Sequence, residues 1–197
     1  METTTTVTTT VVKPLRLIGF ISTIIAFPLI LAACIGDRWM QAPGFYMGLW
    51  KECYNGTRVR EPNVTPRPTP TTEIKCYDSV NEAWLVACQA FVILTILCNV
   101  GAIVLAIVAY FLKQNLLYKV AAITLFVSCL FLIIALIVFP SMFMQGDVVA
   151  YRGNWELGWC YGVAWGAWCF LLAGGILLLC DENKEIYHDE RVYYSEA

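Results

Sequence analysis

Four long apolar runs dominate the sequence and limit the folds that the chain can adopt. They cover approximately Leu17–Gly36, Ala83–Leu112, Val120–Phe143 and Gly158–Cys180. Each run is long enough to cross a hydrocarbon layer about 30 Å thick, which takes roughly 20 helical residues. None of them contains Asp, Glu, Lys, Arg or His, so no charge marks a proton relay or an ion path through the membrane. The pattern predicts an all-α membrane protein built as a four-helix transmembrane bundle.

The composition agrees, because 59% of the 197 residues are hydrophobic and only 14% are charged. We expect residues 17–180 to form one membrane domain, between a disordered cytoplasmic segment at 1–16 and an acidic cytoplasmic tail at 181–197. Leu31–Cys34 resembles a signal cleavage box. However, the apolar run around it is longer than a usual signal core, so we expect an uncleaved first span. The net charge of −2 gives no reason to expect a nucleic-acid partner.

The large polar loop at 37–82 decides the expected orientation, because Lys and Arg are divided almost evenly between the two sides. Cys53 and Cys76 are the two cysteines well clear of the spans, and Asn55 and Asn63 each begin a glycosylation sequon. Disulfides and N-glycans both belong to the lumenal or extracellular side. We therefore expect this loop outside the cell and both termini in the cytoplasm.

Two stretches of the large loop favour strands. Residues 45–54 and 72–80 are rich in aromatic and β-branched residues, whereas the proline-rich segment between them cannot continue a sheet. A disulfide between Cys53 and Cys76 would join the two strands and contribute about 3 kcal/mol if chain entropy dominates. The other seven cysteines fall in or at the ends of the apolar runs, where most would be packing residues.

The loop also carries a family pattern. Trp39, then Gly48-Leu49-Trp50, then Cys53 and Cys76, all between the first two of four spans, resemble the signature of the claudin superfamily. The resemblance implies a claudin-like bundle capped by a small extracellular antiparallel sheet built from both outer loops. We expect the tryptophans to seat that sheet at the membrane surface, where amphipathic rings are favoured.

Residues of the fourth span resemble one particular branch of the superfamily. Asn154-Trp155, Tyr161-Gly162, Gly174-Gly175 and Cys180 resemble the brain cell membrane protein branch of the superfamily. This branch implies a plasma-membrane protein of cell–cell junctions, notably adherens junctions. It also implies a role in adhesion and epithelial organisation, with junctional membrane proteins and cytoplasmic adaptor or cytoskeletal proteins as partners.

Small and aromatic residues of the fourth span indicate packing. Gly158, Gly162 and Gly166 recur every four residues and would line one helix face that permits close backbone approach. We expect that face to pack within the bundle, with another molecule or a second copy as the alternative. The aromatic residues near the outer end predict a membrane-interface belt: Trp155, Trp159, Tyr161 and Trp165. Gln89 and Asn99 are expected to form interhelical hydrogen bonds.

The tail after Cys180 has six acidic residues and two basic ones, which disfavours contact with an anionic inner leaflet. It should be available to cytoplasmic partners. Candidate modification sites are palmitoylation at Cys180 and phosphorylation at Tyr187, Tyr193 and Tyr194. His188, the only histidine, cannot build a metal or acid–base site by itself.

No nucleophile–base pair, metal-ligand cluster or phosphate loop stands out, so we expect neither an enzyme nor a cofactor. A junctional organiser of adhesion is the favoured hypothesis. A paracellular channel is the first alternative, and its selectivity would need charges of one sign along the pore. The large loop instead carries six basic and six acidic residues. The second alternative is an auxiliary subunit of a channel or receptor, for which the glycine face would suit lateral contact.

Overall fold

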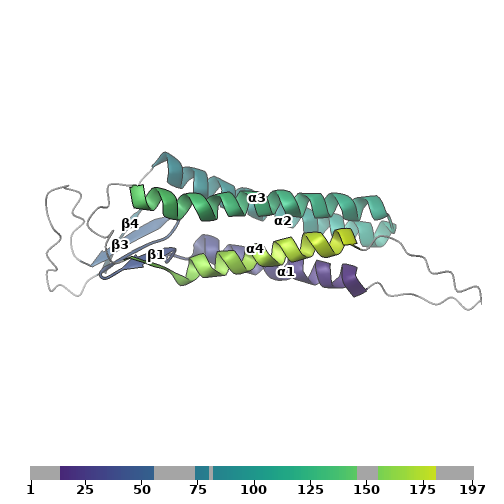
Figure 1. Ribbon diagram of the computed structural model, residues 1–197, viewed down its shortest axis with the longest axis horizontal. Coiled ribbons are helices and arrows are strands. Elements are labelled where there is room, and N and C mark those ends of the chain that lie inside the picture. The colour runs from purple at the N-terminus through teal and green to yellow at the C-terminus, as the bar shows by residue number, and fades with distance from the viewer. Residues whose placement is uncertain (1–13, 56–73, 80–81, 146–154, 181–197) are drawn as a thin grey trace, which may run out of the picture.

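The computed structural model describes residues 14–55, 74–79, 82–145 and 155–180, which form four long helices and a small sheet (Figure 1). The helices are α1 (Pro14–Ile35), α2 (Ala83–Leu112), α3 (Asn115–Gln145) and α4 (Trp159–Cys180). Each is long and apolar enough to cross a membrane. The predicted four-helix transmembrane bundle is confirmed.

The bundle has two layers of two helices. In Figure 1, α2 and α3 lie in one layer and α1 and α4 in the other. Contact is most extensive within each layer, and contacts of α3 with α4 and of α1 with α2 join the layers. Many buried positions are alanines, such as Ala121, Ala135 and Ala164, which let helix backbones approach closely.

The sheet lies at one end of the bundle, which we call the sheet end. At the opposite end, the terminal end, α1 begins, α4 finishes and the short α2–α3 turn lies (Figure 1). The first residue of α1 and the last residue of α4 are therefore on the same side of the bundle, away from the sheet. This arrangement agrees with an even number of crossings.

Helix lengths differ from the expected spans. Helix α3 begins at Asn115 rather than Val120 and so includes Lys119, because a long charged side chain near a helix end can reach the headgroup level. Helices α2 and α3 have 30 and 31 residues, against 22 each in α1 and α4. Arg16 of α1 contacts Asn115 of α3, so these two helices begin at the same level. The extra length of α3, about 14 Å at 1.5 Å per residue, therefore projects at the sheet end.

The sheet has five antiparallel strands in the order β4-β3-β2-β1-β5. They are β1 (Met40–Ala42), β2 (Phe45–Met47), β3 (Lys51–Asn55), β4 (Ile74–Asp78) and β5 (Glu156–Leu157). Only two strands were predicted from the loop residues. The first of those stretches is interrupted at Gly48 and forms two strands, β2 and β3. A tight turn at Gly44, whose φ is 78°, joins β2 to the preceding strand β1. Strand β5 comes from the second loop, as the family resemblance implied.

Candidate functional site

Two indole rings fasten the sheet to the last turn of α1. Trp39 Nε1 donates a hydrogen bond to the Ala33 carbonyl at 2.8 Å, and Trp50 Nε1 donates to the Cys34 carbonyl at 2.7 Å. The last four carbonyls of a helix have no donor within the helix itself. The two signature tryptophans therefore supply donors that α1 lacks, and they fix where the sheet begins.

The Trp39 ring is not exposed on the surface of the protein, so it cannot contact lipid headgroups as the sequence predicted. Its side chain is fully buried, with ring centroids 4.9 Å from Phe139 and 5.9 Å from Tyr161. The indole N–H already has a partner in Ala33, so the ring needs no contact with water. Trp39 is thus a core residue where α1, α3, α4 and the sheet meet, whereas Trp50 stays 38% exposed.

The Gly-Leu part of the signature also has a structural reason. A Cβ on Gly48 would lie only 2.7 Å from the Asp37 Cα atom, so the chain can pass there only without a side chain. Leu49 is fully buried, and its carbonyl accepts hydrogen bonds from Gln89 Nε2 at 2.7 Å and Ser79 Oγ at 3.2 Å. Gln89 therefore binds the sheet-side loop, and not another helix as expected.

A disulfide joins β3 to β4. Cys53 and Cys76 are directly opposite in the antiparallel register, with their Cα atoms 4.0 Å apart, and their sulfur atoms are bonded. The predicted pairing is confirmed. The remaining cysteines of the described residues are free thiols. The covalent link fixes the edge strand β4, which has few helix contacts of its own, to the rest of the sheet.

The start of α4 is bonded to the entry of β1. The Gly158 N–H donates to the Trp39 carbonyl at 2.9 Å, and the Cys160 N–H donates to the Arg38 carbonyl at 3.2 Å. A Cβ on Gly158 would overlap the Arg38 carbonyl oxygen. Gly158 precedes α4 and serves this crossing of two backbones, so it is not part of a helix face as the four-residue spacing predicted.

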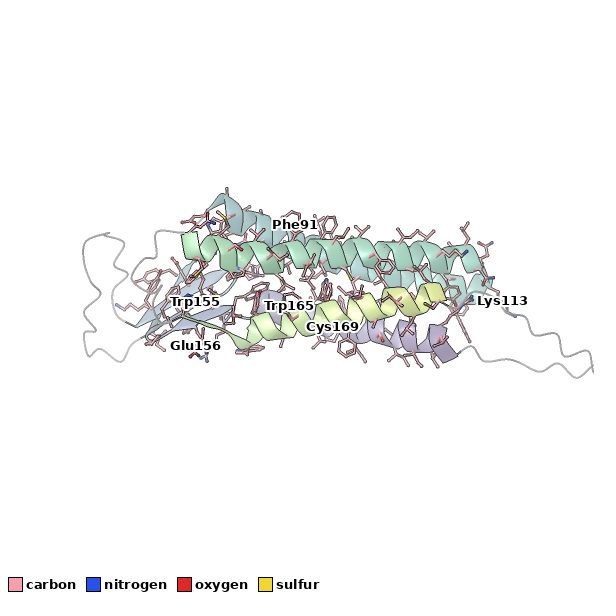
Figure 2. All side chains as sticks on the ribbon, viewed as in Figure 1. Phe91, Lys113, Trp155, Glu156, Trp165 and Cys169 are labelled. Carbon is pink, nitrogen blue, oxygen red and sulfur yellow. A yellow bond between two sulfur atoms is a disulfide. The ribbon has the colours of Figure 1, made fainter. Side chains whose placement is uncertain are left out.

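Tyr161 replaces a missing hydrogen-bond donor in α3. Pro140 has no N–H, so the Leu136 carbonyl four residues earlier loses its partner within the helix. The Tyr161 hydroxyl donates to that carbonyl at 2.9 Å. Tyr161 is accordingly buried and does not belong to an exposed aromatic belt, whereas Trp159 and Trp165 are exposed as such a belt requires. Figure 2 shows where Trp155 and Trp165 lie near the sheet end.

The glycines of α4 divide into two groups. Added Cβ atoms on Gly162 and Gly166 would meet nothing within 4 Å, so packing inside the described bundle does not account for these two residues. Gly174 and Gly175 lie where α4 closely approaches α1 and α3. A Cβ on Gly174 would be 2.8 Å from Thr23 Oγ1, and one on Gly175 would be 3.3 Å from the Phe126 ring.

The polar residues of the bundle core also differ from expectation. Asn99 is fully buried, and neither atom of its amide group has a hydrogen-bond partner among the described residues, so the predicted interhelical bond is wrong. The α2–α3 link is made instead by Thr95 and Ser128. Ser128 Oγ donates to the Thr95 carbonyl at 3.1 Å, whereas Thr95 Oγ1 donates to the Phe91 carbonyl of its own helix at 2.9 Å and lies 3.5 Å from the Ser128 carbonyl oxygen. In the sequence, the only sign of this link was a hydroxyl-bearing residue in each of two consecutive apolar runs, Thr95 in one and Ser128 in the next.

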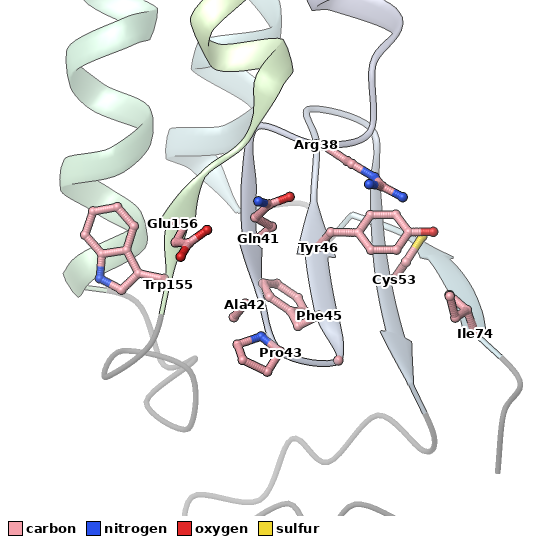
Figure 3. Close-up of a pocket in the computed structure, with 11 residues that line it drawn as sticks. Arg38, Gln41, Ala42, Pro43, Phe45, Tyr46, Cys53, Ile74, Trp155 and Glu156 are labelled. Carbon is pink, nitrogen blue, oxygen red and sulfur yellow. The ribbon is translucent and has the colours of Figure 1, made fainter. Parts of the chain in front are cut away.

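The outer face of the sheet is the face turned away from the bundle. Across neighbouring strands, Glu156, Gln41, Tyr46 and Cys53 are directly opposite one another and so share this face. The Arg38 guanidinium lies 5.1 Å from the Tyr46 ring centroid, a cation–π distance. A cavity of about 720 Å³ adjoins the β1–β2 hairpin and is lined in part by Arg38, Tyr46 and Glu156 (Figure 3).

Several predicted sites lie at or beyond the limits of the described chain. Asn55 is the last residue of β3, and Cys180 is the exposed last residue of α4. Asn63 and the three tail tyrosines, Tyr187, Tyr193 and Tyr194, lie outside the described residues. Within the described ranges, no three His, Cys, Asp or Glu side chains are placed to hold a metal ion.

A family model described as the PMP-22/EMP/MP20/Claudin family matches residues 13–178. The chain belongs to this family. Epithelial membrane protein 2 of Bos taurus is 27% identical over 157 residues, which cover 77% of this chain and 86% of that protein. The lens fiber membrane intrinsic protein of Homo sapiens is 29% identical over 168 residues, which cover 77% of this chain and 82% of that protein.

In this member of the PMP-22/EMP/MP20/Claudin family, the signature residues have structural roles. Trp39 and Trp50 cap α1, Gly48 allows the close crossing, and the disulfide closes the sheet. These residues hold the sheet end together. The chain is a multi-pass membrane protein with a bilayer as its surroundings.

Proposed function

We propose that this family member organises adhesion and epithelial morphology at cell–cell contacts, with adherens junctions as its location. Family membership fits a junction-associated membrane protein. The observation that carries the proposal is the rigid attachment of a mixed-charge sheet to the membrane bundle. Trp39, Trp50 and Gly158 each fix the sheet to a helix end. A preorganised surface loses little conformational entropy on binding, which suits contact with a neighbouring protein.

The charges of the sheet end favour an organiser over a charge-selective channel. Its exposed basic side chains are Arg38, Lys51 and Lys75, and its exposed acidic ones include Asp78 and Glu156. Selective pores of this kind need rings of one sign. Among the described residues, both signs occur on the sheet and Lys51 lies directly opposite Asp78, so the exposed charges do not form a group of one sign.

Lateral contact within the membrane is a further part of the proposal. Gly162 and Gly166 lie one turn apart on α4 and have open space in front of them. Small residues at this spacing let a second helix approach closely, whether it belongs to another copy or to a channel or receptor subunit. Gly162→Leu should reduce cross-linked oligomers on cells and leave thermal stability unchanged. Equal cross-linking in both proteins would contradict the lateral contact.

The orientation proposal places the sheet end outside the cell and both termini in the cytoplasm. We expect endoglycosidase to shift the band of the expressed protein, and Asn55→Gln with Asn63→Gln to abolish that shift. Glycan transfer occurs only in the lumen, so the shift reports the side of the membrane on which the loop lies. A C-terminal tag that an external protease removes from intact cells would contradict the orientation.

The tail would connect the junction to cytoplasmic adaptor or cytoskeletal proteins. Its acidic composition, the three tyrosines Tyr187, Tyr193 and Tyr194, and the exposed Cys180 at the end of α4 support this role. Acyl-exchange labelling at Cys180 and phosphopeptide mass spectrometry of the tail would check the two modifications. Tail peptides recovered only in unmodified form would contradict them.

Removal of the protein from a polarised epithelium tests the functional proposal. We expect the tagged protein at the adherens belt, and we expect its loss to give weakened or misshapen contacts and a disordered cytoskeleton. Re-expression of the intact chain should restore the contacts. Staining confined to internal membranes, or intact contacts after removal, would contradict the proposal.

A further inference from the structure

The two halves of the Cys53–Cys76 disulfide differ in their exposure to solvent. Cys53 lies in β3, between β2 and β4, and is fully buried. Cys76 lies in β4, which is an edge strand of the sheet, and this residue is exposed. A thiolate that breaks a disulfide must reach one of its two sulfur atoms directly. The sulfur that an external thiolate can reach is therefore Cys76 Sγ.

The Tyr46 hydroxyl contacts the disulfide on the outer face of the sheet. Its oxygen lies 3.7 Å from Cys76 Sγ, and the hydroxyl is the donor because a disulfide sulfur carries no proton. Tyr46 is directly opposite Cys53 in the register of β2 with β3, so the hydroxyl and the disulfide share one face. A donor that points at Cys76 Sγ withdraws electron density from this sulfur, which favours attack by a thiolate.

The cavity on the outer face reaches this disulfide. Its volume is about 720 Å³, and its lining includes Arg38, Tyr46, Cys53 and Ile74, the first residue of β4. Figure 3 shows the Tyr46 ring pointing toward Cys53, with the Arg38 side chain beside the ring. Sites for small molecules commonly have volumes of about 300–1,000 Å³. The cavity is thus large enough to hold a thiol of the size of a short peptide next to the disulfide.

Arg38 gives the approach to the disulfide a positive charge. Its guanidinium carbon lies 5.1 Å from the Tyr46 ring centroid, and the residue is exposed. Lys51 is directly opposite Asp78 across β3 and β4, so these two charges offset each other. Glu156 lies on β5, at the opposite edge of the sheet from β4. A nearby guanidinium attracts an anionic thiol and favours its reactive thiolate form.

We propose that Cys76 is a site of thiol–disulfide exchange with a small thiol that carries carboxylate groups. The thiol gives its proton to the solvent, and its sulfur then forms a bond to Cys76 Sγ. The Cys53–Cys76 bond breaks, and its electron pair leaves on Cys53 Sγ, which takes up a proton from water. The products are a mixed disulfide at Cys76 and a thiol at Cys53. The exchange removes the covalent link between β3 and β4, and the site does not depend on the junctional role.

Mapping of the mixed disulfide in full-length protein tests the site. The protein in nanodiscs is mixed with glutathione, free thiols are blocked with N-ethylmaleimide at short intervals, and peptide mass spectrometry reads residues 53 and 76. We expect the first product to carry glutathione on Cys76 and maleimide on Cys53, while tryptophan fluorescence still reports folded protein. Glutathione on Cys53, equal amounts on both cysteines, or reaction only in thermally unfolded protein would overturn the proposal.

The preference for an anionic thiol is tested with two thiols. Glutathione carries one more negative charge than 2-mercaptoethanol, so Arg38→Gln should lower the ratio of their initial rates by about threefold, the effect of one nearby charge in water. Lys113→Gln is the matched control, because it removes a cation at the terminal end, opposite the sheet (Figure 2). This variant should keep the wild-type ratio. An unchanged ratio in Arg38→Gln, or the same decrease in both variants, would contradict the role of Arg38.

Discussion

Trp39→Ala is expected to lower the free energy of unfolding by about 3–5 kcal/mol, the range for loss of a large buried aromatic side chain. The change leaves a cavity between Phe139 and Tyr161 and removes the donor to the Ala33 carbonyl. Because Trp39 joins α1, α3, α4 and the sheet, we expect the variant to be retained inside the cell. Thermal unfolding of purified protein and surface biotinylation measure the two effects.

Trp159→Ala is the matched control, because it removes the same side chain from a position that is 57% exposed. We expect this variant to reach the surface and to unfold within a few degrees of the wild type. Similar losses in the two variants would show that tryptophan content matters and that burial at position 39 does not.

Gly158→Ala is the second substitution for which we expect a large effect, on the order of 3 kcal/mol from overpacking and weakened hydrogen bonds. The new Cβ would overlap the Arg38 carbonyl, so the backbones of β1 and the start of α4 must move apart. That movement would weaken the hydrogen bonds of Gly158 to Trp39 and of Cys160 to Arg38. Thermal unfolding measures the loss.

Gly162→Ala, one turn further along α4, adds the same methyl group into open space. It should leave the unfolding temperature unchanged or raise it slightly, because alanine favours helix over glycine by up to about 1 kcal/mol. A larger loss for Gly162→Ala than for Gly158→Ala would contradict the crossing described for Gly158.

The helices could be predicted from the sequence because length and hydropathy alone determine membrane spans. Ala83 and Leu112 begin and end α2 as expected, and α1 and α4 differ from expectation by a few residues at most. The Cys53–Cys76 pairing was also predictable, since these two residues lie outside the spans and the large loop contains no other cysteine in the sequence.

The roles of the signature residues could not be predicted, because they depend on contacts between distant segments. An aromatic residue near a span end has the same local sequence whether it faces lipid or core, and Trp39 and Tyr161 are buried because Ala33 and Leu136 offer unpaired carbonyls. Likewise, the spacing of Gly158, Gly162 and Gly166 is regular, yet Gly158 precedes the helix. The three-residue strands β1 and β2 are too short to give a periodic pattern.

The measurement that tests the central claim most directly is ion selectivity in an epithelium that lacks claudins. Cells that express this protein alone are grown as a sheet, and the dilution potential for sodium and chloride is recorded. A junctional organiser with a mixed-charge outer face predicts no change in charge selectivity, together with improved contact integrity. A charge-selective conductance carried by this protein alone would contradict that account and would establish a paracellular channel.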